Sequence, residues 1–420
     1  MPASISSGDG GGDAAAPKRA SFSRACPTIY LAGPCGGHTG GMYQVSVYLQ
    51  QASREVHAAS ARFRLMDTRG AWAVVSPLYV LVAAVRILLA RVLGQLAGVH
   101  IHVSERLSLV RKGLLVALCR AIRSPVVLHL HAAELEQHYA GLPRALRAGV
   151  RAVFRGADCC IALGQASASF MEHELGVSPA RIEVVTNGVP EPAVSARAAG
   201  APDTFRVLFV GQLSERKGVS VLLHALADAR LRDVPVQLSL AGRGDIARYQ
   251  ALADALGIGA KVRFTGWMEK KAVDQLLAES DVFVLPSFHE GLPLAILEAL
   301  ALGVPTVCTP VGEIPHVLEH GRSVHIVPAG DAEALAGALV ALAGNAALRR
   351  TLSRGGRAAY EARFSLTAFA AAIATVHRRY FGVSALDGQD GGWTMSRGGI
   401  GSSASLLQDP IEQPVQLRAG

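Results

Sequence analysis

The sequence predicts an α/β protein of two domains, each an open parallel sheet covered by helices. With 420 residues, half of them hydrophobic, the chain is long enough for two domains with sizeable cores. Short apolar runs alternate with helical stretches along most of the chain, as buried parallel strands and covering helices require. A strand, a glycine-rich loop and a helix follow one another near the start of each half, after Ala32 and again after Val210.

The first strand is predicted at Thr28 to Ala32, and a glycine-rich loop from Gly33 to Gly41 follows it. A helix is predicted from about Met42. Such a loop leaves backbone N–H groups uncovered and lets a phosphate approach closely. A plain tight turn between a strand and a helix has the same composition, so the loop by itself does not identify a ligand.

Both ends of the chain are predicted to be flexible tails, at residues 1–24 and 383–420. The first is composed mainly of Gly, Ser, Ala and Asp and lacks an apolar core, so we see no signal peptide in it. The last is rich in Gly and Ser. The six cysteines are scattered without metal-binding spacing, which favours reduced thiols in a cytosolic protein.

The stretch from Arg62 to Arg155 is strongly basic. It holds fourteen basic and four acidic side chains, an excess of ten, whereas the whole chain has a net charge of +8. It also contains a long apolar run at 71–90, interrupted by Pro77 and Arg86, whose uncharged part is shorter than the about 20 residues of a spanning helix. Two interpretations remain open, a core helix with snorkelling arginines or a segment on an anionic membrane surface. Nucleic acid is disfavoured because no aromatic residues interleave with the charges.

Two further strands are predicted at residues 99–103 and 125–130. The second delivers His131 at its carboxyl end, where open α/β sheets bind their ligands. A lone histidine at such a place is more often a structural group than a catalyst. We expect His129 on the opposite face of the strand from His131.

The first domain is predicted to end after strands at 157–162 and 182–185, at a turn that closes with Val189. Residues 190–203 are rich in Pro, Ala and Gly and read as a linker. We therefore predict domains at 25–189 and 204–364, with a last helix at 365–382.

The second domain begins with a strand from Phe205 to Val210, followed by a glycine loop that ends at Lys217-Gly218 and a helix to about Ala229. An ammonium group at this loop could neutralise a departing pyrophosphate. A basic side chain at the edge of a loop is also often simply solvated. Further elements are predicted from the same patterns, namely strands at 236–241 and 261–266 and helices at 331–342 and 346–360.

The chain is organised around residues 281–312, which predict a strand, a turn, a helix from Leu292 with Pro293 in its first turn, and a second strand. Glu290 stands just before the helix, beside free N–H groups that could bind a ligand phosphate. Glu298 lies two turns further in an apolar stretch, where a carboxylate usually has a hydrogen-bond partner. The alternative is a favourable helix-start charge at Glu290 and a solvated Glu298.

The segment PSFHEGLPLAILEALALGVPTVCTPVG resembles the E-x7-E segment of retaining, nucleotide-sugar-dependent glycosyltransferases of the GT-B fold, family 4, also called glycosyltransferase group 1. The resemblance covers most of the C-terminal half and, more weakly, the N-terminal half. It implies two Rossmann-like domains facing each other across a cleft, with the last helix crossing back to the first domain. In the family the first glutamate contacts the donor sugar and the second binds the ribose, roles that fall on Glu290 and Glu298.

Other donor-binding positions follow from the same resemblance. The backbone of Gly291, Leu292 and Pro293 is implied to lie against the donor diphosphate, with Gly41 facing it from the first domain. His131 is similar to the family's strand-end histidine near the anomeric carbon.

The loop from Gly211 to Gly218 is similar to the family's G-R-L…K-G motif, whose arginine and lysine hold the phosphates. Lys217 matches the lysine, but Gln212 stands at the position of the arginine, so either Arg216 replaces its charge or the diphosphate is held less strongly. At the later turn Gly312 to His316, Glu313 is a substitution from which we draw no functional inference.

The resemblance therefore implies a retaining hexosyltransferase in which His131, Lys217 and Glu290 are catalytic. It implies no cofactor and no metal at the site, and the chain has no D-x-D pair. The acceptor is predicted to be a sugar or a lipid-linked saccharide in bacterial surface polysaccharide biosynthesis. The protein is predicted to be cytoplasmic, at the inner face of the cytoplasmic membrane if the basic segment binds there, and not to bind nucleic acid.

The sequence is also compared with what three other functions predict. A nucleotide-sugar epimerase would share the GT-B architecture, and a non-catalytic membrane scaffold would bind no nucleotide. A dinucleotide oxidoreductase predicts G-x-G-x-x-G with an acidic residue about 20 positions later. Neither glycine loop of this chain has that spacing.

Overall fold

The structure is a computed structural model that describes residues 26–35, 40–55, 59–70, 72–132, 134–196 and 204–386. Several expectations fall on residues outside these ranges. They are the first tail, most of the last tail, the centre of the first glycine loop at 36–39 and the end of the linker at 197–203.

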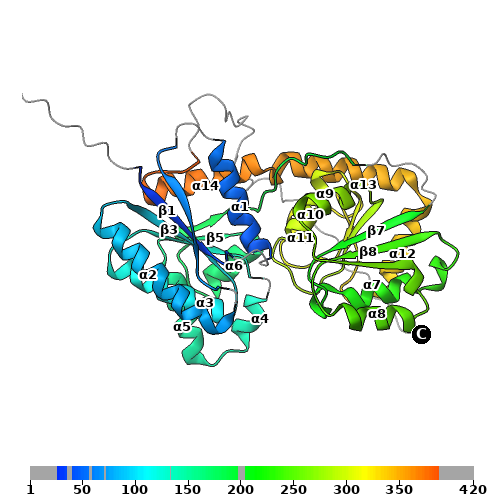
Figure 1. The fold of residues 1–420 in the computed structure, drawn as a ribbon, viewed down its shortest axis with the longest axis horizontal. Coiled ribbons are helices and arrows are strands. Elements are labelled where there is room, and N and C mark those ends of the chain that lie inside the picture. The colour runs from blue at the N-terminus through cyan, green and yellow to red at the C-terminus, as the bar shows by residue number, and fades with distance from the viewer. Residues whose placement is uncertain are drawn as a thin grey trace, which may run out of the picture.

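Two parallel sheets of six strands lie side by side, each covered by helices (Figure 1). The first sheet has the order β2-β1-β3-β4-β5-β6. Its strands are β1 (Thr28–Gly33), β2 (Arg62–Asp67), β3 (Leu96–Val103), β4 (Val126–Leu130), β5 (Cys159–Ala162) and β6 (Ile182–Val184). Its helices are α1 (Gly41–Arg54), α2 (Ser76–Val92), α3 (Leu107–Ala121), α4 (Leu135–Ala140), α5 (Arg144–Gly156) and α6 (Gln165–His173).

The second sheet has the order β12-β11-β10-β7-β8-β9, the strand order of doubly wound nucleotide-binding domains. Its strands are β7 (Phe205–Val210), β8 (Val236–Ala241), β9 (Val262–Gly266), β10 (Val282–Leu285), β11 (Thr306–Cys308) and β12 (His325–Ile326). Its helices are α7 (Val219–Leu226), α8 (Ile246–Ala255), α9 (Lys270–Ala278), α10 (Leu294–Ala301), α11 (Ile314–Val317), α12 (Ala332–Gly344) and α13 (Ala346–Ala359). The predicted fold class, two α/β domains with parallel sheets, is confirmed.

The last helix, α14 (Leu366–Phe381), returns to the first domain, as the resemblance implied (Figure 1). Ser365 starts it by accepting the N–H of Ala368 at 3.2 Å. Just before it, the N–H of Val189 donates to the carbonyl of Phe364 at 2.9 Å, and the N–H of Leu366 donates back to Val189 at 2.8 Å. The crossing point of the two domains is thus fixed by backbone hydrogen bonds.

The apolar run at 71–90 forms most of α2, which lies on the outer face of the first domain beside α3 (Figure 1). Only a narrow stripe of it is buried, at Val80, Ala83, Ile87 and Ala90. The rest of the helix leaves large apolar side chains in solvent. The interpretation as a core helix is therefore wrong for most of its surface. Among the described residues, no helix combines the length and apolar character needed to cross a membrane.

Two local expectations need correction. The central helix, α10, begins at Leu294 rather than Leu292, and Pro293 precedes it in extended conformation instead of standing in the first turn. The helix after Gly218 ends at Leu226. α10 ends at Ala301, and Gly303 follows its C-cap with a left-handed φ of +66° that suits glycine.

Candidate active site

Two loops of the second domain meet at the carboxyl edge of its sheet. One follows β7 and ends in Lys217, and the other follows β10 and carries Glu290. The Lys217 ammonium forms an ion pair with Glu290 Oε1, to which Ser287 Oγ also donates at 2.7 Å. Glu290 is only 8% exposed, so the pair is little screened by solvent. Two residues predicted to be catalytic are therefore in direct contact.

Two glycines allow this close approach. Gly218 has a φ of +72°, and a Cβ there would lie 2.0 Å from the carbonyl oxygen of Pro286. Gly312 has a φ of +59°, and its Cβ would lie 2.1 Å from the carbonyl oxygen of Glu290. A larger residue at either place would be strained and would push the loop of Glu290 away.

Arg216 lies beside the same carboxylate. Its Nη1 donates to the carbonyl of His289 at 2.8 Å and is 4.0 Å from Glu290 Oε2. Gln212 is exposed at the edge of the loop, and Gly211 donates its N–H to the carbonyl of Ala241 at 2.9 Å. Arg216 thus places a guanidinium beside the Glu290 carboxylate. It is the candidate to supply the charge that Gln212, at the position of the family's arginine, lacks.

The N-terminal ends of two helices face each other between the domains. α1 begins at Gly41 and α10 at Leu294, and a Cβ on Gly41 would lie 3.7 Å from Leu294 Cδ1. Neither first turn contains an acidic residue or a side-chain cap. Their free N–H groups place two partial positive charges near one point, which suits an anionic ligand. Leu292 and Pro293 lead into this end of α10.

The loop of Gly291 reaches the first domain close to His131. A Cβ on Gly291 would lie 3.2 Å from Leu163 Cδ1 and 3.7 Å from the carbonyl oxygen of Ala132. Ala132 directly follows His131, so the structure brings the strand-end histidine to the loop that carries Glu290.

His131, which directly follows β4, lies beside histidines of β3 and β4. Its Nε2 is 2.9 Å from His102 Nδ1, and burial lowers the pKa of His131 to about 3. The imidazole is therefore neutral near pH 7 and acts through hydrogen bonds rather than charge. The rings of His129 and His131 are 4.1 Å apart, so the expectation that they face opposite ways is wrong. Residues two positions apart in a strand share a face.

Glu298 has the hydrogen-bond partner that its apolar surroundings predicted. Its Oε1 accepts from the Tyr48 hydroxyl of α1 at 2.7 Å and lies 3.4 Å from Lys270 Nζ. Burial raises the pKa of Glu298, and the nearby Lys270 ammonium opposes that shift. The alternative of a solvated Glu298 is wrong, since its side chain is 11% exposed.

Glu313 makes a contact between the domains that the sequence did not predict. Its carboxylate reaches from the second domain to the start of α6, where Oε1 accepts from Ser167 N at 2.8 Å and from Ser167 Oγ at 2.6 Å. Oε2 accepts from Ala166 N at 3.2 Å. A carboxylate at a helix N-terminus is favourable, so Glu313 fastens one domain to the other. No local pattern predicts it, because its partner helix lies in the other domain.

Two comparisons with protein families cover both domains. Residues 37–188 match the glycosyl transferase 4-like domain, and residues 204–345 match the glycosyl transferases group 1. Solved glycosyltransferase structures that superpose on this chain are less than 25% identical to it and show its fold, which is GT-B.

Two curated relatives illustrate the sequence similarity. A phosphatidyl-myo-inositol mannosyltransferase of Mycobacterium leprae is 38% identical over 170 residues, 39% of this chain and 45% of the relative. A putative colanic acid biosynthesis glycosyltransferase, WcaL, of Salmonella typhimurium is 30% identical over 195 residues, 44% of this chain and 48% of the relative. The chain thus spans about half the length of these curated relatives.

Two solved structures illustrate the similarity in fold. Sucrose-phosphate synthase from Thermosynechococcus elongatus superposes with a TM-score of 0.71 at 20% identity, covering 85% of this chain and 99% of that one. Anabaena Alr3699/HepE in complex with UDP superposes with a TM-score of 0.66 at 19% identity, covering 83% of this chain and 99% of that one.

Proposed function

Because this chain carries a glycosyl transferase 4-like domain and a group 1 glycosyl transferase domain, we propose that it transfers a sugar from a nucleoside-diphosphate sugar to an acceptor hydroxyl. The observation that supports this most is the ion pair of Lys217 and Glu290 beside two facing helix ends. One ammonium and two sets of free N–H groups are suited to a diphosphate, and the carboxylate is suited to the hydroxyls of its sugar.

We propose that the transfer retains the configuration at the anomeric carbon. The bond from that carbon to the diphosphate oxygen breaks, and the acceptor oxygen forms its bond on the same face. The acceptor proton passes to a phosphate oxygen of the departing diphosphate, so the charges balance without a protein base. Lys217, with Arg216 beside it, stabilises the negative charge that grows on the leaving group, which is the largest contribution such a site makes.

The other site residues position the donor. Glu290 and neutral His131 bind sugar hydroxyls, and Glu298 binds the ribose, exchanging its bond to Tyr48 for one to a ribose hydroxyl. Each of these steps uses a group already oriented by the fold. The donor diphosphate needs no metal ion in this arrangement.

The test is a screen of UDP-, GDP- and ADP-sugars, with and without saccharide acceptors. We expect one nucleotide series to be consumed, faster when an acceptor is present, and NMR of the product to show the anomeric configuration of the donor. Conversion of the donor to a different sugar without acceptor would support the epimerase alternative. No consumption of any donor would contradict the proposal.

We propose that the acceptor is lipid-linked and that the outer face of α2 and α3 docks on an anionic membrane. The exposed apolar side chains of this face form one surface on two neighbouring helices. Among them are Leu78, Leu81, Val82, Val85, Leu89 and Val92 on α2, and Leu107, Val110 and Leu114 on α3. Arg86, Arg91 and Arg106 are exposed among them, and each arginine near an anionic surface contributes about 1 kcal/mol. The relative named for colanic acid biosynthesis supports a polysaccharide context.

Replacing Leu81 and Leu89 with glutamate is expected to abolish binding to vesicles that contain phosphatidylglycerol, because it removes apolar area and adds repulsive charge. Both side chains are more than half exposed, so the fold should tolerate the change. Flotation of the full chain with such vesicles measures the effect. Val184→Glu on β6, at the far edge of the first sheet, is the matched control and should still bind. Equal flotation of the wild type with neutral phosphatidylcholine vesicles would contradict the electrostatic part.

A further inference from the structure

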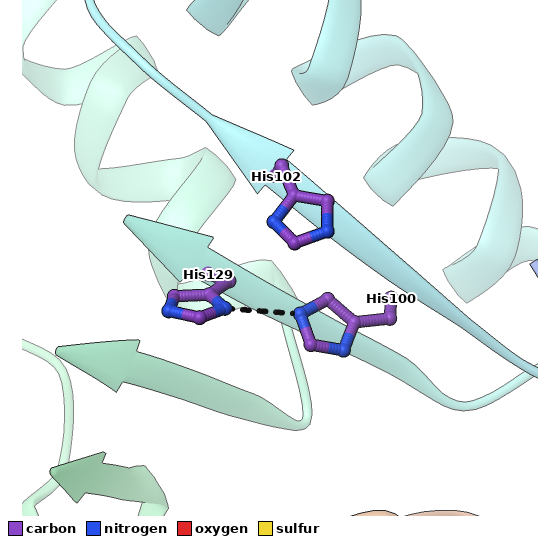
Figure 2. A group of neighbouring side chains, drawn as sticks. All are labelled: His100, His102 and His129. Carbon is purple, nitrogen blue, oxygen red and sulfur yellow. Dashed lines mark hydrogen bonds between the residues drawn. The ribbon is translucent and has the colours of Figure 1, made fainter. Parts of the chain in front are cut away.

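Five histidines gather beneath the carboxyl edge of the first sheet, away from the ion pair of Lys217 and Glu290. His100 and His102 stand on β3, His129 on β4 and His131 directly after it, and His377 comes from α14. The register pairs His102 with His129, so imidazoles from two neighbouring strands lie side by side. Figure 2 shows His100 and His102 projecting from one strand toward His129 on its neighbour. His100, His102, His129 and His377 have no exposed surface.

Hydrogen bonds between the rings account for some of their nitrogens and leave others without a partner. His100 Nδ1 is 2.9 Å from His377 Nε2, His100 Nε2 is 3.2 Å from His129 Nδ1, and His102 Nδ1 is 2.9 Å from His131 Nε2. His102 Nε2 and His129 Nε2 are buried without a hydrogen-bond partner. A neutral imidazole has one donor nitrogen and one acceptor nitrogen. Whichever tautomers are chosen, His102 Nε2 and His129 Nε2 therefore remain unsatisfied, each as a donor or as an acceptor. Each such group costs about 1–3 kcal/mol.

From this geometry we propose that His100, His102 and His129 bind a divalent transition metal ion of the type that prefers imidazole, represented by zinc. One ring nitrogen from each lies within 4.8 Å of the others. Two nitrogens of a tetrahedral zinc site are about 3.3 Å apart, so the pair of His100 Nε2 and His129 Nδ1, at 3.2 Å, already has that spacing. Since the nitrogens lie within 4.8 Å of one another, the largest separation would have to shorten by at most about 1.5 Å to close the triangle.

The surrounding histidines supply the second contacts that such sites use for two of the three ligands, whereas Nε2 of His129 has no hydrogen-bond partner. The other nitrogen of His100 bonds His377, and the other nitrogen of His102 bonds His131. Ring nitrogens held in this way fix the orientation and the tautomer of metal-binding histidines. Since Nδ1 of His102 is engaged by His131, Nε2 is the nitrogen left for the ion, and Nδ1 then donates its proton to His131 Nε2. The ion would therefore position His131 without touching the donor diphosphate, and its binding does not depend on the proposed sugar transfer.

The test uses the full chain, stripped with a chelator, dialysed, and loaded with zinc sulfate. Elemental analysis is expected to find one zinc per chain, and zinc is expected to raise the melting temperature. His129→Asn and His102→Asn should each lose the zinc and the thermal shift. The control is His320→Gln with His325→Gln, since these two rings lie 4.9 Å apart in the second domain and could hold an adventitious ion. That double variant should keep one zinc.

Two results would overturn the proposal. One is a wild-type chain that retains no zinc after dialysis, which requires no variant and so does not depend on how the variants fold. The other is loss of zinc from the control at His320 and His325 while the variants of His102 and His129 retain it. Cobalt loading gives an independent measure, because imidazole ligands produce a visible absorption that should be present in the wild type and absent in His129→Asn.

Discussion

Replacing Lys217 with alanine is expected to lower the rate of sugar transfer by about two to three orders of magnitude, the usual effect of removing one group that stabilises developing charge. Lys217 carries the ammonium that faces Glu290 at the carboxyl edge of the second sheet. Its loss removes a positive charge from the leaving diphosphate, so kcat should fall more than the affinity for donor. The measurement is steady-state kinetics with the donor identified by the screen.

Glu290→Gln is the companion variant, since it keeps the shape of the side chain and the contact with Ser287 but removes the charge. It should lower transfer by a similar factor. Lys271→Ala is the matched control, because Lys271 is exposed on α9 of the same domain and should keep full activity. Near-normal turnover of Lys217→Ala with an unchanged melting temperature would remove Lys217 from the mechanism.

Lys112→Met is expected to stabilise the protein, by up to about 4 kcal/mol near pH 6. Lys112 is 1% exposed on α3, and its ammonium donates to Thr68 Oγ1. Burial lowers the pKa of Lys112 to about 7, with Arg111 adding to the shift while Asp67 and Cys35 oppose it. Methionine has a similar length without the charge, and Thr68 keeps its bond to the carbonyl of Gly33.

The stabilisation by Lys112→Met should decrease as the pH rises. Below about pH 7 the folded protein holds a buried charged ammonium, so this charge destabilises the folded state to its full extent. As the pH rises from about 7 toward the ordinary lysine pKa near 10.4, the folded state is already neutral while the unfolded chain still binds a proton, and the cost shrinks. Near pH 9 the gain should be about 2 kcal/mol. Urea unfolding at both pH values measures it, with Lys271→Met as the control; an equal gain at both values would contradict the assignment.

The parts of this fold that sequence reasoning predicted are those with a local signal. The strand and glycine loops before Lys217 and the segment around Glu290 are contiguous motifs, and parallel strands bring their carboxyl ends to one edge. That edge brings Lys217 and Glu290 together, although the ion pair between them was not itself predicted. The exact start of α10 did not, because Pro293 is compatible with both the first turn and the residue before it.

Contacts between the domains were harder to predict. The bond of Glu313 to α6 and that of Tyr48 to Glu298 depend on how two separate domains close, and neither has a pattern in its own segment. The exposure of α2 was also not predictable from the sequence, because the helix is apolar on most sides and the pattern does not mark which side is buried. The histidine cluster did have a signal in the sequence, namely the two H-x-H pairs at 100–102 and 129–131. Because side chains two positions apart in a strand share a face, each pair should have been predicted to lie on one face of the sheet.

The central claim is that the crevice beside Lys217, Glu290 and the starts of α1 and α10 holds a nucleoside diphosphate. Calorimetric titration of UDP, GDP and ADP into the wild-type chain and into Lys217→Ala tests it most directly. The account predicts that one of the three binds the wild type and that the variant binds it at least about tenfold more weakly, a loss of about 1.4 kcal/mol. Failure of all three to bind the wild type, or equal binding by the variant, would contradict it.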